Sequence, residues 1–164
     1  MKTLTLIRHA KSCWENANLH DMVRPLNGRG EMSIPLIGNH LKENNIHPDL
    51  IYTSPATRAL HTAIGIGGIL GCHPEDFQIN QEIYFGDATS IIELNKSTNN
   101  IYRDVFLFGH DNFLADIVFE LTDERPAKFP TCAAYRMQFE TDNWQEIKNG
   151  KKIMFVYPKQ FVKV

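Results

Sequence analysis

The sequence predicts an α/β fold of three layers (α/β/α), with helices covering both faces of a mainly parallel central sheet. Short, apolar, β-rich segments alternate along the chain with segments that have helical spacing. Such alternation is typical of strands that are joined by crossover helices and buried on both faces. No repeat, low-complexity run or Ser/Gly-rich linker interrupts the 164 residues, so we expect one domain over residues 1–164.

The first strand is predicted over Thr3–Arg8, a short apolar run that is rich in β-formers. A polar loop follows it through Asp21. A helix is then expected over Gly28–Asn45, with Pro35 either in its first turns or kinking it. Four apolar residues of this segment have helical spacing: Met32, Leu36, Ile37 and Leu41.

The second strand is predicted over Asp49–Thr53. Ser54 and Pro55 then form a helix-start signal, with the serine as N-cap and the proline at the first helical position. We expect the helix that begins there to run to about Leu70, before Gly71.

The second half of the chain continues the alternation. A strand over Phe77–Asn80 precedes a helix over Ala88–Lys96, and a strand over Asp104–Phe108 precedes a helix over Asn112–Leu121. Two final strands, expected to pair antiparallel at one edge and separated by a turn region around Trp144, are Ala133–Phe139 and Ile153–Val156.

Composition excludes several classes of function. A net charge of −2 gives no electrostatic case for a nucleic-acid partner. No apolar stretch approaches the roughly 20 residues that span a bilayer, and the first residues do not resemble a signal peptide. The sequence also lacks the glycine-rich phosphate loops of nucleotide-binding domains.

The cysteine pattern indicates a reducing compartment. The three cysteines are odd in number and scattered, and no two form a CxxC pair. We therefore expect reduced thiols in a cytoplasmic protein, and a monomer, because no apolar stripe exceeds the needs of a core. The cysteines are Cys13, Cys72 and Cys132.

Three polar clusters each follow a predicted strand: Arg8-His9, the segment Ser54–Arg58, and Gly109-His110. In open α/β sheets, ligands bind beyond the carboxyl ends of the strands, so we expect these clusters to meet at one edge. A single histidine after a strand is usually a local hydrogen-bonding residue, but two histidines and two arginines in such places indicate a site. Five other histidines have no ligand spacing: His20, His40, His47, His61 and His73.

These residue types fit a tetrahedral anion. Arginine remains charged and binds phosphate oxygens bidentately, and Arg58 lies in the first turn of its helix, where backbone N–H groups also favour an anion. His110 adds a donor, and a neutral imidazole nitrogen of His9 can attack phosphorus to form a transient phosphohistidine. No metal or other cofactor is needed. A metal site built on the two histidines is disfavoured because Arg8 and Arg58 already concentrate positive charge there.

With these clusters in order, the sequence resembles the histidine phosphatase superfamily, and most of all its short branch of phosphohistidine phosphatase-like proteins. Leu6–Ser12 resembles the motif that opens that branch, and Asp21–Gly30 resembles the second motif. Ser54–Ala59 followed by Thr62-Ala63 resembles the third, and Phe108–His110 the fourth. The segment Phe129–Ala133, with Trp144 downstream, matches less specifically.

The resemblance implies a phosphoglycerate mutase-like fold and metal-independent transfer of a phosphoryl group to His9 and then to water. It implies a phosphate pocket made by Arg8, His9, Arg58 and His110, with Ser12 and Arg24 as further candidates. The chain is too short for the large inserted lid of mutases and phytases. An open pocket suits a phosphate on a protein surface, so a phosphorylated protein, phosphohistidine included, or a small phosphomonoester is the expected partner.

Two features leave alternatives open. The family commonly has Gly-His-Asn-Pro at the fourth motif, whereas this chain has Asp111 after His110, and that carboxylate opposes anion binding unless it is turned away or paired; it could instead orient His110. It favours the alternative function, a catalytically weak phosphate-binding regulatory protein of the same fold. The general acid is unassigned among Glu82, Asp87 and Asp21. Arg24 either reaches the phosphate or anchors Asp21 by an ion pair.

Overall fold

The computed structural model describes residues 1–162, and its centre is one six-stranded sheet with the strand order β3-β2-β4-β1-β5-β6. β1 pairs in parallel with β4, and β2 pairs in parallel with both β4 and β3. β5 is antiparallel to β1 and β6 is antiparallel to β5. The mainly parallel sheet and its antiparallel edge are both confirmed. The strands are β1 (Lys2–Arg8), β2 (Leu50–Thr53), β3 (Phe77–Ile79), β4 (Asp104–Gly109), β5 (Ala134–Phe139) and β6 (Lys151–Val156).

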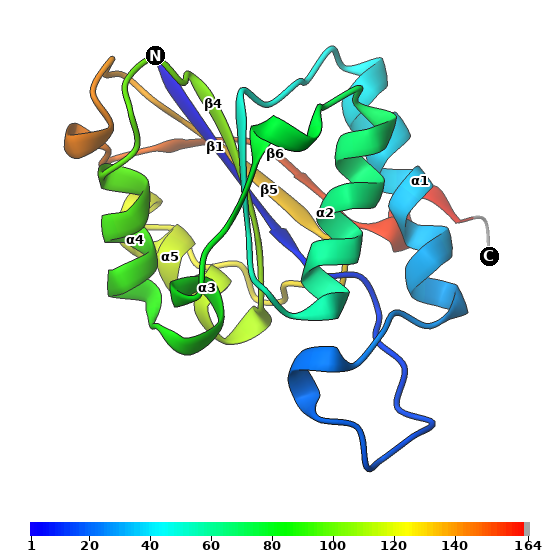
Figure 1. Ribbon diagram of the computed structural model, residues 1–164. Coiled ribbons are helices and arrows are strands. Elements are labelled where there is room, and N and C mark those ends of the chain that lie inside the picture. Colours follow the sequence, from blue (N-terminus) through cyan, green and yellow to red (C-terminus); the bar gives the residue numbers. More distant parts are fainter. Residues whose placement is uncertain (163–164) are drawn as a thin grey trace.

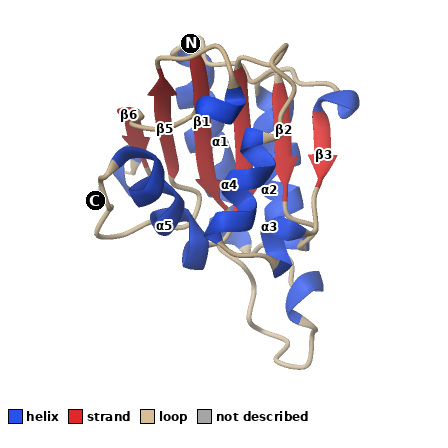
Figure 2. Ribbon diagram, turned by 90° about the vertical axis from the view of Figure 1, so that its left-hand side faces the viewer, coloured by secondary structure: helices blue, strands red, loops and turns tan. Residues whose placement is uncertain are grey.

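Helices cover both faces of this sheet, which makes the three predicted layers (Figure 1). Figure 2 shows α4 and α5 in front of the strands, while α1 and α2 lie behind them. Each face has its own apolar cluster, because alternate residues of the buried strands point to opposite sides. The helices are α1 (Gly28–Glu43), α2 (Thr57–Ile69), α3 (Glu82–Phe85), α4 (Ala88–Lys96) and α5 (Asp111–Thr122).

Two details of the predicted helices are wrong. Ser54 does not cap a helix that starts at Pro55: α2 begins at Thr57, and its N-cap is Ala56, which has no capping side chain. The Ser54 hydroxyl instead accepts from the backbone N–H of Ala56 and faces His110. Met32 is 72% exposed although its spacing fits the helix, because the face of α1 that packs on the core runs through Ile37 and Leu41.

Short elements account for most other differences. α3 was not predicted; its four residues are too few to show helical periodicity. A 3-10 helix, Asp21–Val23, lies in the polar loop after β1, and another, Trp144–Glu146, holds the fully buried Trp144. Within residues 1–162, no helix is long and apolar enough to cross a membrane.

Candidate active site

The three polar clusters meet at one edge of the sheet, because β2, β4 and β1 are neighbours and run in the same direction. Backbone hydrogen bonds continue the sheet past the strand ends: the N–H of His9 donates to Gly109 at 3.0 Å, and that of Ser54 donates to Phe108 at 3.1 Å. His9 and His110 are buried, with ring centroids 5.3 Å apart. The three motifs, which are far apart in the sequence, therefore lie together beyond the carboxyl ends of the parallel strands, as predicted.

The ring of His9 is held in one tautomer. Its Nδ1 lies 2.7 Å from the carbonyl oxygen of Ala10, and a carbonyl only accepts, so Nδ1 carries the proton. Burial, together with the nearby Arg58 and Arg8 guanidinium groups, lowers the pKa of His9 to about 4, against the raising effect of the Ala10 carbonyl. At neutral pH the ring is uncharged, and Nε2 keeps a free lone pair.

His110 is also neutral in this setting. Its Nε2 lies 2.9 Å from the hydroxyl of Ser54, and its Nδ1 lies 3.5 Å from a guanidinium nitrogen of Arg58. Because a guanidinium only donates, Nδ1 accepts and Nε2–H donates to Ser54. Burial, followed by repulsion from His9 once that ring is protonated and from Arg58, lowers the pKa of His110 to about 3. Ser54 thus fixes the orientation of the second ring.

Arg58 connects the site to the polar loop after β1. Its guanidinium donates to the backbone carbonyl of Asp21 at 2.8 Å and to the Asp21 carboxylate at 3.0 Å. The hydroxyl of Tyr84, on α3, donates to the same carboxylate at 2.6 Å. The Tyr84 hydrogen bond, followed by Arg58, lowers the pKa of Asp21, so this carboxyl group holds no proton for a leaving group at neutral pH.

Arg8 lies on the other side of the cluster. It donates to the carbonyl of Phe129 at 2.9 Å, and its guanidinium is 3.8 Å from the carboxylate of Asp111. Its Nε is buried and has no hydrogen-bond partner among residues 1–162. A buried donor without a partner is costly, so an oxyanion that reached it would relieve that cost. Asp111 is thus turned toward Arg8, and its side chain is half exposed at the rim.

The remaining candidates lie outside this cluster of contacts. Arg24 is buried, but its guanidinium donates to three backbone carbonyls of its own loop and lies over the ring of Trp14. It forms no ion pair with Asp21, whose carboxylate bonds Arg58 and Tyr84 instead. Asp87 caps α4 by accepting from the Ser90 N–H.

The last two candidates contribute less. Glu82 is exposed at the start of α3. Ser12 is buried and forms an isolated β-bridge with Leu26. Neither side chain has a contact with His9, Arg58 or His110 among the hydrogen bonds of the described chain.

Three contributors to the site were missed by sequence reasoning. Ser54 was interpreted as a helix cap and as part of a polar cluster and motif, without a contact to His110, and Thr62 was interpreted only as part of a motif. Thr62 is fully buried; its hydroxyl accepts from the N–H of Ala10 at 2.9 Å and donates to the carbonyl of Arg58 at 2.7 Å. Tyr84 gave no signal, because it lies on the helix that periodicity did not reveal.

The arrangement combines two guanidinium groups with two neutral imidazole rings, one of which has an unprotonated Nε2. Such a site can bind a tetrahedral oxyanion and present a nitrogen nucleophile to it. Among the residues that the structure describes, no three His, Cys, Asp or Glu side chains gather into a group that could hold a metal ion.

Comparison with known families agrees with this chemistry. A family model described as the histidine phosphatase superfamily (branch 1) matches residues 4–113, which include all three polar clusters. The chain belongs to the histidine phosphatase superfamily.

Solved structures of two phosphatases share the fold over nearly the whole chain. The protein histidine phosphatase SixA, complexed with tungstate, matches with a TM-score of 0.82 and 25% identity, over 98% of this chain and 99% of that one. A phosphoserine phosphatase from Entamoeba histolytica, in complex with 3-phosphoglyceric acid, matches with a TM-score of 0.67 and 15% identity, over 99% of this chain and all of that one. This second likeness shows the fold alone.

Curated relatives match over a shorter segment. Phosphoglycerate mutase 1 from Saccharomyces cerevisiae is 37% identical over 65 residues, which is 38% of this chain and 26% of that protein. A 2,3-bisphosphoglycerate-dependent phosphoglycerate mutase from Bifidobacterium longum is 39% identical over 62 residues, 37% of this chain and 25% of that protein. The match therefore spans about a quarter of these relatives' length.

Proposed function

We propose that the chain is a metal-independent phosphatase that transfers a phosphoryl group to Nε2 of His9 and then to water. The observation that carries this proposal is the hydrogen bond from Nδ1 of His9 to the Ala10 carbonyl, which leaves Nε2 unprotonated and free to attack. Membership of the histidine phosphatase superfamily supports the same reaction.

In the first step the Nε2 lone pair forms a bond to phosphorus while the bond from phosphorus to the leaving oxygen or nitrogen breaks. Arg8 and Arg58 hold the phosphoryl oxygens and stabilise the charge that spreads over them in the transition state. His110 can donate to the same oxygens when its proton moves to Nδ1 and its Nε2 accepts from the Ser54 hydroxyl instead. In the second step water attacks the phosphohistidine, the P–N bond breaks, and orthophosphate leaves with His9 restored.

The proposed substrate class is a phosphorylated protein, with phosphohistidine as the favoured group. The likeness to SixA, a protein histidine phosphatase, supports this choice. A phosphorylated nitrogen can be protonated before it leaves, so such a substrate has little need of a general acid. This fits a site in which the Asp21 carboxyl group is kept ionised.

We further propose a monomer acting in the cytoplasm. Three free thiols within the described residues support a reducing compartment.

The deciding experiment measures orthophosphate release from p-nitrophenyl phosphate and from a phosphohistidine-bearing protein, with a chelator present throughout. His9→Ala should abolish turnover of both substrates, whereas His61→Ala, which changes an exposed histidine of α2, should keep it. Rapid quenching at high pH, where phosphohistidine survives, should trap one phosphoryl group on His9. Equal turnover in His9→Ala would contradict the mechanism.

The alternative is a phosphate-binding regulatory protein with little turnover, which the carboxylate of Asp111 beside Arg8 favours. It predicts saturable binding of orthophosphate without product release from either substrate. Under that alternative, Asp111→Asn should tighten orthophosphate binding and still give no turnover.

A further inference from the structure

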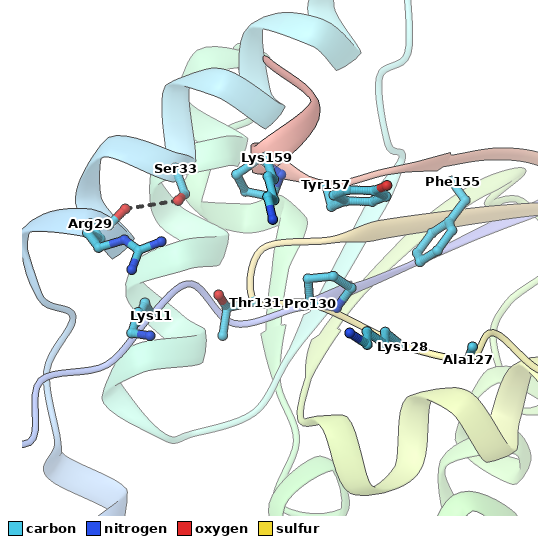
Figure 3. A pocket seen from close by; sticks show the side chains of 11 residues that line it. Lys11, Arg29, Ser33, Ala127, Lys128, Pro130, Thr131, Phe155, Tyr157 and Lys159 are labelled. Carbon is cyan, nitrogen blue, oxygen red and sulfur yellow. Dashed lines mark hydrogen bonds between the residues drawn. The ribbon is translucent and has the colours of Figure 1, made fainter. Parts of the chain in front are cut away.

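A groove lined by cationic side chains lies next to the candidate active site. This groove, of about 580 Å³, opens between the start of α1, the segment before β5 and the end of β6 (Figure 3). Four cationic side chains line the groove. Among the residues that the structure describes, no acidic side chain lines it. The cationic residues are Lys11, Arg29, Lys128 and Lys159.

These charges have no counter-ion of their own. Within residues 1–162, none of the four side chains takes part in an ion pair; the charged end of Arg29 points into the groove, as does that of Lys159 (Figure 3). All four residues are exposed. Like charges that gather around one hollow raise the local concentration of anions, so the groove is complementary to an acidic ligand.

The groove lies at the same edge of the sheet as His9. Val156, the last residue of β6, pairs with Ala134, and Ala134 pairs with Ile7, just before the polar cluster after β1. Lys11 follows His9 by two residues, so their Cα atoms are at most about 7 Å apart. Phe129 accepts from Arg8 on the site side, while the next two residues of that segment line the groove.

The floor of the groove is apolar and aromatic. Pro130, Phe155 and Tyr157 line it, and the ring of Phe155 packs against Phe129 at 5.7 Å and Tyr157 at 5.9 Å between centroids. A bare phosphate would leave this apolar surface unused, and the volume far exceeds one phosphate group. A polypeptide segment that has acidic side chains along its edges and aliphatic stems over the floor uses both properties.

We propose that this groove binds an acidic segment of the phosphorylated protein substrate, on the same polypeptide whose phosphoryl group enters the pocket of His9. The proposal rests on the proposed function, since it names a substrate for that site. In this proposal, the cationic side chains around the groove select among phosphorylated proteins, whereas Arg8 and Arg58 bind the phosphoryl group itself.

The test uses two synthetic 12-residue peptides, each with one central phosphohistidine, that differ only in three glutamates or three glutamines on one side. The protein should hydrolyse the glutamate peptide with a kcat/KM about tenfold above that of the glutamine peptide, given the modest strength of exposed ion pairs. In Arg29→Glu/Lys159→Glu this ratio should fall to one or below. The ratio should stay near tenfold in Lys148→Glu, which reverses the charge of an exposed lysine. Lys148 lies just before β6, at the end of that strand that is opposite to the groove.

A binding measurement separates this proposal from the proposed function. A fluorescent, unphosphorylated glutamate peptide should bind the native protein in low salt and bind Arg29→Glu/Lys159→Glu at least about fivefold more weakly. This measurement does not depend on turnover, so it tests whether the groove binds an acidic peptide even if neither phosphopeptide is hydrolysed. Equal affinity of the native protein and the doubly reversed variant, or displacement of the peptide by pyrophosphate at lower concentration than by unlabelled peptide, would overturn the proposal.

Discussion

The carboxylate of Asp21 lies 3.0 Å from the guanidinium nitrogen of Arg58 that also faces His110. An anion of the protein itself therefore occupies part of the hydrogen-bonding capacity that the proposed substrate needs. The backbone carbonyl of Asp21 binds the other terminal nitrogen of Arg58, so the loop and the arginine are linked by two contacts.

Removing that charge should strengthen the binding of anions. We expect Asp21→Asn to lower the inhibition constant of orthophosphate by about threefold to tenfold, because Asp21 is partly exposed and its repulsion is screened. Inhibition of p-nitrophenyl phosphate hydrolysis measures this, with Glu15→Gln on the same loop as the control. Weaker inhibition would mean that the carboxylate chiefly positions Arg58.

The buried histidines predict a loss of stability in mild acid. The pKa values of His9 and His110 are lowered to about 4 and about 3, below the ordinary value of 6.5 in the unfolded chain. The unfolded state then binds more protons between pH 6.5 and those values, so the contribution of the two histidines to the free energy of unfolding is greatest above pH 6.5. As the pH drops through this window, each histidine lowers that free energy by up to about 1.4 kcal/mol for every pH unit crossed.

Urea unfolding at pH 7 and pH 4.5 measures this loss. His110→Gln should reduce the difference between the two pH values, whereas His61→Gln, which changes an exposed histidine, should leave it unchanged. An identical pH dependence in all three proteins would show that other groups cause it.

Two adjacent glycines of α2 should respond in opposite ways to alanine. A Cβ at Gly67 would lie 2.5 Å from the ring of Phe77 on β3, whereas one at Gly68 would meet nothing within 4 Å. We expect Gly67→Ala to destabilise the fold by about 1–3 kcal/mol through overpacking. Gly68→Ala should stabilise it by up to about 1 kcal/mol through helix propensity. Urea unfolding of the two variants provides the comparison.

The loop after β1 should depend on Arg24. Its guanidinium donates to the carbonyls of Cys13, Asn16 and Leu19, a set of contacts that a lysine amino group cannot reproduce from one point. We expect Arg24→Lys to speed cleavage of this loop by thermolysin severalfold at unchanged global stability. Arg125→Lys, at an exposed arginine of another loop, is the matched control. Unaltered cleavage would show that other contacts order the loop.

The sequence predicted the sheet and the meeting of its motifs because both depend on strong, local signals. Buried strands such as Asp104–Phe108 are apolar throughout after their first residue, and a cluster that contains an arginine or a histidine lies at the end of three of them. Parallel strands then bring those ends together wherever they are neighbours. The convergence of His9, Arg58 and His110 follows from this topology.

What escaped prediction depends on single side-chain contacts between distant segments. Ser54 has a sequence context typical of a helix cap, yet its hydroxyl orients His110, a residue 56 positions away. Tyr84 reaches Asp21 across 63 positions from a four-residue helix. Arg24 looked like a phosphate ligand, but its donors bind the loop. Tertiary packing determines hydrogen-bond partners of this kind, and the periodicity of apolar residues in the sequence contains no information about them.

Thr62 links the two backbone segments that carry the proposed nucleophile and one of the proposed phosphate ligands. Its single buried hydroxyl joins the backbone of Ala10, which follows His9, to the backbone of Arg58. If His9 is the nucleophile and Arg58 binds the phosphoryl group, as proposed, this bridge holds their backbones at one separation before substrate arrives, which lowers the ordering entropy lost on binding. In the proposed reaction, substrate preference could then change at the outer surfaces while the distance from His9 to phosphorus stays the same.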